Sequence, residues 1–295
     1  MSFAVLDPRF APLMQPDAEA EQLWTGGTWT EGPAWFSAGY LIWSEIPSNR
    51  ILRRDDATGQ ITTFRQPSFG ANGNTVDRQG RLVTCEGSSR QLTRTETNGL
   101  TTVLAHRANG LRFNAPNDVV ERSDGTLWFS DPTYGGPDYQ GTPEMTGCHV
   151  WRLDPATGDL SQMTTDMVMP NGLAFSLDEQ HLYIIDTGSS EGPDFPNHIR
   201  RFGVTPGGLT GGEVFATSAA QAMDGLRLDR DGNLWCGEAD GVHCYAPDGT
   251  LIGKITLPER AANLCFGDPA PGGATWLYIT ATTSLYRIAV RAVRA

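Results

Sequence analysis

The sequence predicts an all-β protein, and more specifically a six-bladed β-propeller with four antiparallel strands in each blade. The first observation is composition: 295 residues include 34 glycines and 19 prolines, which is typical of many short strands joined by tight turns. The second is repetition. A pair of apolar-alternating strands recurs six times, at intervals of about 40 to 55 residues, which matches the period of a propeller blade.

The six repeats align on one polar residue that precedes the first strand of each. These residues are Glu31, Asn72, Asn117, Asn171, Asp224 and Asn263. In four repeats, a glycine eight residues later would turn the first strand into the second. These glycines are Gly39, Gly80, Gly125 and Gly232. Most repeats then continue into a third strand, a turn such as DATG or PDG, and an outer fourth strand.

The last repeat ends after three strands, near Val293. We expect residues 20–25 to supply its missing outer strand, because they precede the first repeat and have no partner within it. This pairing would close the ring and leave no long open sheet edge. Residues 1–295 would then form a single propeller domain, with residues 1–18 as an N-terminal arm. Residues 218–222 are the best candidate for a short helix.

Charge and composition exclude several classes of partner. The net charge is −12 and no run of basic residues occurs, so we expect neither a nucleic acid nor a membrane partner. The N-terminus lacks the pattern of a signal peptide, and no apolar stretch is long enough to span a bilayer. The five cysteines show no CxxC spacing, which favours buried free thiols in a reducing cytoplasm. Oligomeric state is not predicted.

The six aligned polar residues indicate a metal site. They fall where the innermost strand of each blade begins, beside the central tunnel. Turn capping would explain any one of them, but it explains a complete ring of oxygen-bearing side chains less well. Carboxylate and amide oxygens are the ligands that hard divalent cations such as Ca²⁺, Mg²⁺ and Mn²⁺ prefer. We therefore expect one divalent ion in the tunnel.

A second set of acids follows the aligned residues by fourteen or fifteen positions. Its members are Glu45, Glu86, Asp131, Asp186 and Glu238. Because the first strand of a blade descends and the second returns, both sets should lie at the same end of the tunnel. We expect these acids to form an outer shell that orients the metal ligands through hydrogen bonds or water.

Other catalytic signatures are weak. The five histidines occupy unrelated positions in the repeats, and neither HExxH nor GxSxG occurs. The loop over residues 132–147 lengthens the third repeat on the side of the aligned residues. It is either a lid or specificity loop, or surplus loop without a role.

Several segments are similar to the gluconolactonase/regucalcin (senescence marker protein) family. They are EGPAWF, NAPNDV, PNGLAFS and MDGLRLD, within a similarity that runs from about residue 24 to residue 293. The resemblance implies a six-bladed propeller with one tunnel metal and lactonase activity on sugar lactones, and related folds hydrolyse organophosphates. It places metal ligands at Glu31, Asn171 and Asp224, and a residue near metal and substrate at Asn117. Animal members have an arginine in contact with substrate where this chain has Ala115, so the sugar preference stays open.

Together, these features predict the hydrolysis of small lactones, such as gluconolactone, to the hydroxy acid. One divalent ion would be held by Glu31, Asn117, Asn171 and Asp224, with Ca²⁺ as the first candidate and Mg²⁺, Mn²⁺, Zn²⁺ or Fe²⁺ as alternatives in catalysis. Asp224 would act as general base, while Asn117, Asn72 and Glu86 would contact the substrate. Two alternatives stay open: a phosphotriester hydrolase that uses the same metal site, and a non-catalytic propeller scaffold.

Overall fold

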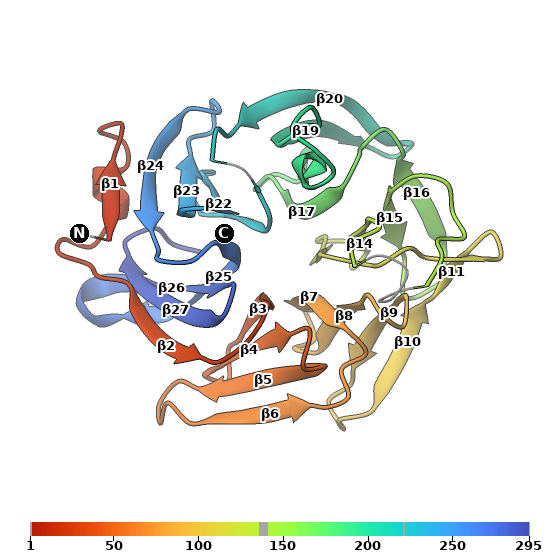
Figure 1. The fold of residues 1–295 in the computed structure, drawn as a ribbon, viewed down its shortest axis with the longest axis horizontal. Helices are drawn as coiled ribbons and strands as arrows, with labels where there is room; N and C mark the ends of the chain where they lie inside the picture. The colour runs from red at the N-terminus through yellow and green to blue at the C-terminus, as the bar shows by residue number, and fades with distance from the viewer. Residues whose placement is uncertain (1, 136–140, 221, 295) are drawn as a thin grey trace.

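The sheets of the protein are arranged in a closed ring around a central axis (Figure 1). The computed structural model describes residues 2–135, 141–220 and 222–294. Six of the sheets are antiparallel and have at least four strands each. The predicted six-bladed β-propeller is therefore confirmed.

Each blade is a meander in which successive strands pair with their neighbours. Blade one contains β3 (Thr30–Phe36), β4 (Tyr40–Glu45), β5 (Arg50–Asp55) and β6 (Ile61–Arg65). Blade two contains β7 (Ala71–Val76), β8 (Leu82–Glu86), β9 (Gln91–Thr95) and β10 (Thr101–Ala105). A two-stranded hairpin, β11 (Arg107–Ala108) and β12 (Leu111–Arg112), leads into blade three. Blade three contains β13 (Val119–Glu121), β14 (Leu127–Asp131), β15 (His149–Leu153) and β16 (Leu160–Thr164).

The second half of the ring repeats this arrangement. Blade four contains β17 (Pro170–Phe175), β18 (His181–Asp186), β19 (His198–Thr205) and β20 (Gly208–Thr217). Blade five contains β21 (Leu226–Leu228), β22 (Leu234–Glu238), β23 (Gly241–Tyr245) and β24 (Leu251–Thr256). Blade six contains β25 (Ala261–Ala270), β26 (Ala274–Ala281) and β27 (Ser284–Val290).

The N-terminal strand closes the ring as predicted. Strand β2 (Glu21–Thr25) pairs antiparallel with β27 and gives blade six its fourth strand. Trp24 on β2 also packs against Trp43 of blade one, with ring centroids 5.7 Å apart. The closing strand therefore joins the last blade to the first.

The residues before β2 are docked on blade five. Strand β1 (Phe3–Val5) pairs with β24 as a fifth strand of that blade. Phe10 is fully buried, and its ring centroid lies 5.7 Å from that of Trp235. Gly253 makes room for it, because a Cβ atom at that position would lie 2.2 Å from the Phe10 ring.

The apolar core is divided among the contacts between neighbouring blades. Each of six apolar clusters contains buried side chains from two adjacent blades, for example Trp43 with Tyr278, and Trp128 with Ile184. The five cysteines are buried and free, as expected. None of the helices among the described residues has the length and apolar character that a membrane crossing requires.

The prediction of a short helix at residues 218–222 is wrong. The described residues of this segment, 218–220 and 222, are not helical. Ser218 Oγ accepts a hydrogen bond from the Ala220 N–H at 3.1 Å. A serine side chain that binds nearby backbone in this way competes with helix formation.

Candidate active site

The aligned polar residues lie where the inner strands begin, at one end of the tunnel. In β3, β7 and β17 the pairing with the second strand shifts register at this point. A bulge of this kind re-aims the side chains of a strand. In several blades a glycine follows the aligned polar residue. Because it has no side chain, the backbone of the next inner strand can approach it closely. A Cβ atom on Gly73 would lie 2.4 Å from Asn117 O, and one on Gly172 would lie 2.4 Å from Asp224 O.

A cavity of about 510 Å³ opens at this end of the tunnel. Five of the six aligned residues line it: Glu31, Asn72, Asn117, Asn171 and Asp224. Its remaining wall includes Trp29, Tyr134, Thr187 and Arg260. The sixth aligned residue, Asn263, is buried and donates a hydrogen bond from Nδ2 to Glu31 Oε2 at 3.2 Å.

Two buried carboxylates define the electrostatics of the cavity. Glu31 Oε2 also accepts a hydrogen bond from the Gly32 N–H at 3.0 Å. Burial raises the pKa of Glu31 well above its ordinary value, and the negative charge of Asp224 adds to that effect. Burial also raises the pKa of Asp224, although the positive charge of Arg260 opposes the shift. Arg260 Nη2 lies 2.7 Å from Asp224 Oδ2.

The side-chain amides are oriented by their neighbours. Asn171 Nδ2 donates hydrogen bonds to Tyr134 Oη at 3.3 Å and to Thr187 Oγ1 at 3.2 Å. Thr187 Oγ1 donates in turn to Met223 O at 2.6 Å. The amide nitrogen of Asn171 is thus engaged on one side, which leaves its carbonyl oxygen as the atom that can serve as a ligand.

The donor set fits a hard divalent cation. Among the described residues no group of three or more His, Cys, Asp or Glu side chains could hold a metal ion, so a site here depends on mixing carboxylates with amides. Glu31 and Asp224 supply two negative charges, and Asn171 and Asn117 supply neutral amide oxygens at the same cavity. This combination of oxygen ligands suits Ca²⁺, Mg²⁺ or Mn²⁺.

The second set of acids lies at the predicted end of the tunnel, but its hydrogen-bond partners differ from those predicted. Glu45, Glu86 and Asp186 stand opposite the first residues of inner strands, so their predicted level is confirmed. Within the described residues, they form no direct hydrogen bonds to the proposed metal ligands. Glu45 accepts a hydrogen bond from the Thr28 N–H, and Asp131 from the Asn114 N–H. These acids hold the loops that enter the blades.

Glu86, which the sequence placed in contact with substrate, lies outside this cavity. It is fully buried, with Arg65 Nη2 3.0 Å from its Oε1. Thr93 Oγ1 donates to Oε1, and Ser89 Oγ and Gln91 Nε2 donate to Oε2. The structure gives Glu86 a structural role between blades one and two, so we leave it out of the proposed site.

Sequence reasoning missed three residues at or beside the cavity. Arg260 and Tyr134 lie in loops between strands. Such loops differ from blade to blade, so alignment of the repeats could not find these residues. Asp118 follows Asn117 directly. It is 1% exposed, and its Oδ2 lies 3.4 Å from Asn263 Nδ2 and 3.3 Å from Arg227 Nη1. A carboxylate beside an aligned polar residue was the available signal.

The long loop of blade three contributes directly to the cavity. Tyr134 and Gly135 line it, which favours a specificity role for this part of the loop over residues 132–147. Residues 136–140 lie outside the described residues.

Comparison with known proteins gives a consistent set of matches. A family model described as "SMP-30/Gluconolactonase/LRE-like region" matches residues 29–283. A gluconolactonase from Zymomonas mobilis is 28% identical over 95% of this chain and 84% of its own length. A pentonolactonase from Haloferax volcanii is 27% identical over 81% of this chain and 77% of its own length. The structure of a gluconolactonase from Xanthomonas campestris superposes with a TM-score of 0.90 at 33% identity, covering 98% of this chain and 95% of the other.

Proposed function

The chain belongs to the SMP-30/gluconolactonase/LRE-like family, and from this premise we propose that it is a lactonase that hydrolyses small sugar lactones, such as gluconolactone, to the hydroxy acid. The lactonases among its relatives support this reaction class. The observation that carries the proposal in this chain is the convergence of Glu31, Asn117, Asn171 and Asp224 on one cavity. Its volume of about 510 Å³ lies in the range of small-molecule sites.

Asp224 is the proposed general base. Arg260 holds Oδ2 of its carboxylate at 2.7 Å, and the carboxylate lines the cavity, where it can take a proton from the attacking water. The water oxygen then bonds to the lactone carbonyl carbon, the bond from that carbon to the ring oxygen breaks, and the ring oxygen takes up a proton. Lactone and water together give one hydroxy acid, so the reaction needs no further reactant.

The neighbouring side chains position the ring for this attack. Asn117 and Asn72 present amide groups that can bind the hydroxyl groups of a sugar lactone. Arg260 lies over the Trp29 ring, with its guanidinium carbon 5.0 Å from the ring centroid. Trp29 thus holds the guanidinium of Arg260 in place. The guanidinium in turn favours one orientation of the Asp224 carboxylate, the proposed base.

We propose that Glu31, Asn171, Asp224 and Asn117 hold one divalent cation, with Ca²⁺ as the resident ion. Mg²⁺, Mn²⁺, Zn²⁺ and Fe²⁺ are alternatives in catalysis. When bound, such an ion would polarise the lactone carbonyl and stabilise the negative charge that develops on its oxygen. The two buried carboxylates would supply the balancing negative charge, and the ion would oppose the effect of burial, which raises the pKa of both groups.

The test is the turnover of a panel of aldonolactones by Asp224→Asn at saturating metal. Turnover is measured as the release of acid. This variant keeps the shape and one oxygen ligand but loses the proton acceptor, so we expect kcat to fall by about 10²- to 10⁴-fold. Asp231→Asn is the matched control, because Asp231 is exposed at the turn between β21 and β22 of the same blade.

Near-full activity of Asp224→Asn would show that the base lies elsewhere.

Asp229 would be a poor control for this experiment. It is fully buried and accepts hydrogen bonds from Trp235 Nε1 at 2.9 Å and from the Asn233 N–H at 2.9 Å. Faster turnover of a phosphotriester than of any lactone in the same assay would reject sugar lactones as the substrate class.

A further inference from the structure

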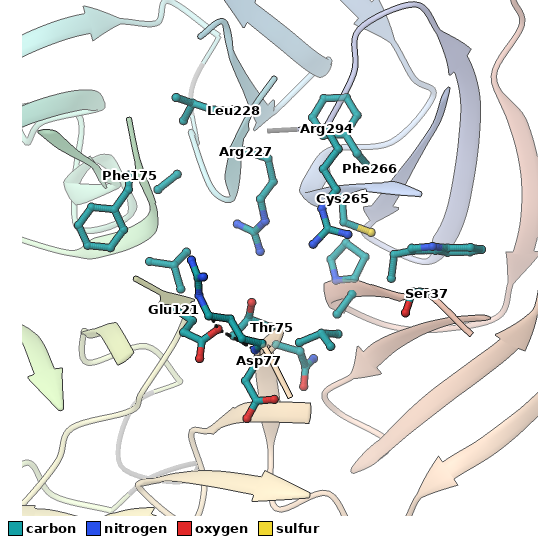
Figure 2. A pocket seen from close by; sticks show the side chains of 18 of the residues that line it. Ser37, Thr75, Asp77, Glu121, Phe175, Arg227, Leu228, Cys265, Phe266 and Arg294 are labelled. Carbon is teal, nitrogen blue, oxygen red and sulfur yellow. Dashed lines mark hydrogen bonds and ion pairs between the residues drawn. The ribbon is translucent and has the colours of Figure 1, made fainter. Parts of the chain in front are cut away.

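A second cavity, of about 580 Å³, lies at the far end of the inner strands. The strands that begin at the candidate active site end here: Asp224 lines the first cavity, and Arg227, three residues on, lines the second. Figure 2 shows this cavity with Arg227 and Arg294 extending into it. Nothing in the proposed lactone hydrolysis uses this end of the tunnel.

Two guanidinium groups converge on the second cavity from separate parts of the chain. Arg227 belongs to β21, and Arg294 lies in the C-terminal segment, which forms a β-bridge to Asp229. Both approach the Cys265 thiol in the cavity wall. Burial raises the pKa of Cys265 to about 12, and the positive charges of Arg227 and Arg294 act against that rise.

Much of the hydrogen-bonding capacity of these two groups is unused. Arg227 Nη1 lies 3.3 Å from Asp118 Oδ2 and donates to Leu226 O at 2.6 Å. Within the described part of the chain, the Arg294 guanidinium forms neither a hydrogen bond nor an ion pair, and Arg294 is exposed. An arginine side chain offers five N–H donors in a planar fork, so both retain donors for a ligand.

The acids in the cavity wall already have partners. Asp77 Oδ2 pairs with Arg81 Nε at 2.7 Å. Glu121 Oε2 accepts a hydrogen bond from the Arg78 N–H at 2.8 Å, with Arg78 Nε 3.8 Å away. Glu179 accepts from the Ser123 N–H at 2.7 Å and pairs with Arg122. These carboxylates are therefore already paired, and Asp118 is the one that lies beside Arg227.

We propose that the second cavity binds a small oxyanion, a carboxylate or a phosphate, between Arg227 and Arg294. Both anions match the planar fork of a guanidinium, which can donate two parallel hydrogen bonds to their oxygens. The site is separate from lactone hydrolysis and does not depend on it.

The experiment is calorimetric titration of the full chain with inorganic phosphate and, separately, with sodium gluconate, at an ionic strength held constant with NaCl. We expect saturable binding of at least one anion. Arg294→Gln and Arg227→Gln should each weaken it by about ten- to a hundred-fold, because each removes charge-assisted hydrogen bonds. Arg201→Gln is the matched control. It removes the same charge from a surface pair with Glu213 on the outer side of blade four.

The absence of saturable binding by both anions, or an unchanged affinity in Arg294→Gln, would overturn the proposal. Arg294 is exposed and its replacement leaves the pairing of Asp118 intact, so this variant gives an answer even if Arg227→Gln fails to fold. Comparison of phosphate with gluconate identifies which oxyanion the cavity prefers. Anion binding that depends on Arg260 and not on Arg294 would belong to the cavity of Asp224, and would also contradict the proposal.

Discussion

At the scale of single residues, neighbouring positions on one strand have opposite roles in this propeller. Ser44 Oγ donates a hydrogen bond to Asn72 O at 2.7 Å, beside the tunnel. Glu45, the next residue, faces the other side of the sheet and binds the Thr28 N–H, because side chains alternate along a strand. The spacing of acids in the sequence showed their level along the tunnel but not this difference in direction. For that reason the spacing could not show that Glu45 binds a loop rather than a metal ligand directly.

His243 provides a test of buried charge at the same scale. Its imidazole is 3% exposed, with Nδ1 3.1 Å from Glu238 Oε2 and Nε2 2.7 Å from Asp240 Oδ1. Burial favours the neutral ring, but Glu238 and Asp240 outweigh it, so the pKa of His243 is raised above 6.5. A raised folded-state pKa means that the stabilisation is complete below about pH 6.5 and is lost as the pH rises through the folded-state value.

We therefore expect the free energy of unfolding to separate wild type from His243→Gln most at about pH 6. The difference should shrink as the pH is raised through the folded-state pKa, because the protein then loses the charged form that the two carboxylates stabilise. Urea unfolding at a series of pH values measures it. His106→Gln, at an exposed position, is the control, and its free energy of unfolding should stay close to that of the wild type. A pH-independent difference for His243→Gln would contradict the assignment.

At the scale of elements, the N-terminal segment contacts two different blades. Strand β2 completes blade six, and this pairing was predictable because the last repeat lacked an outer strand. Strand β1 and Phe10 pack on blade five, and no feature of the repeat indicated this. The reason is that β1 is an addition to a blade that is already complete. Periodicity can reveal a missing strand, but it cannot reveal an extra one.

Phe10 should make the N-terminal segment a stabilising part of the propeller. Phe10→Ala would remove a fully buried ring that packs on Trp235 and Gly253. Such a cavity typically costs about 3 to 5 kcal/mol in the free energy of unfolding. Leu6→Ala is the control in the same segment, since Leu6 is 55% exposed. If urea unfolding gives the two variants equal stability, the docking of this segment contributes little to the native state.

At the scale of the whole molecule, the propeller separates its stability from its chemistry. Apolar clusters between blades form the core, and polar residues of the inner strands surround the tunnel. The ring and the aligned residues were predictable because six copies of one pattern must meet at one axis. Arg260 was not, since its contact with Asp224 depends on the conformation of the loop between β24 and β25. Loops of this kind differ from blade to blade, so the repeat carries no information about them.

The same separation predicts how the protein responds to removal of its proposed metal. Binding to the native state alone stabilises it by mass action, by about 2.7 kcal/mol when the free ion is at 100 times its Kd. For a chain of this length, chelation should then lower Tm by roughly 5 °C, and excess Ca²⁺ should restore it. Asn171→Ala should lose most of this response, because it deletes a proposed ligand while the apolar clusters stay intact.

Asp231→Asn, at an exposed position in blade five, should respond to chelator and Ca²⁺ as the wild type does. Chelated Asn171→Ala should still unfold cooperatively, because the apolar clusters between the blades stay intact. The decisive measurement is the Tm difference between chelated and Ca²⁺-saturated protein for the three chains. An equal shift in Asn171→Ala and wild type would mean that the stabilising ion binds outside the cavity of Glu31 and Asp224.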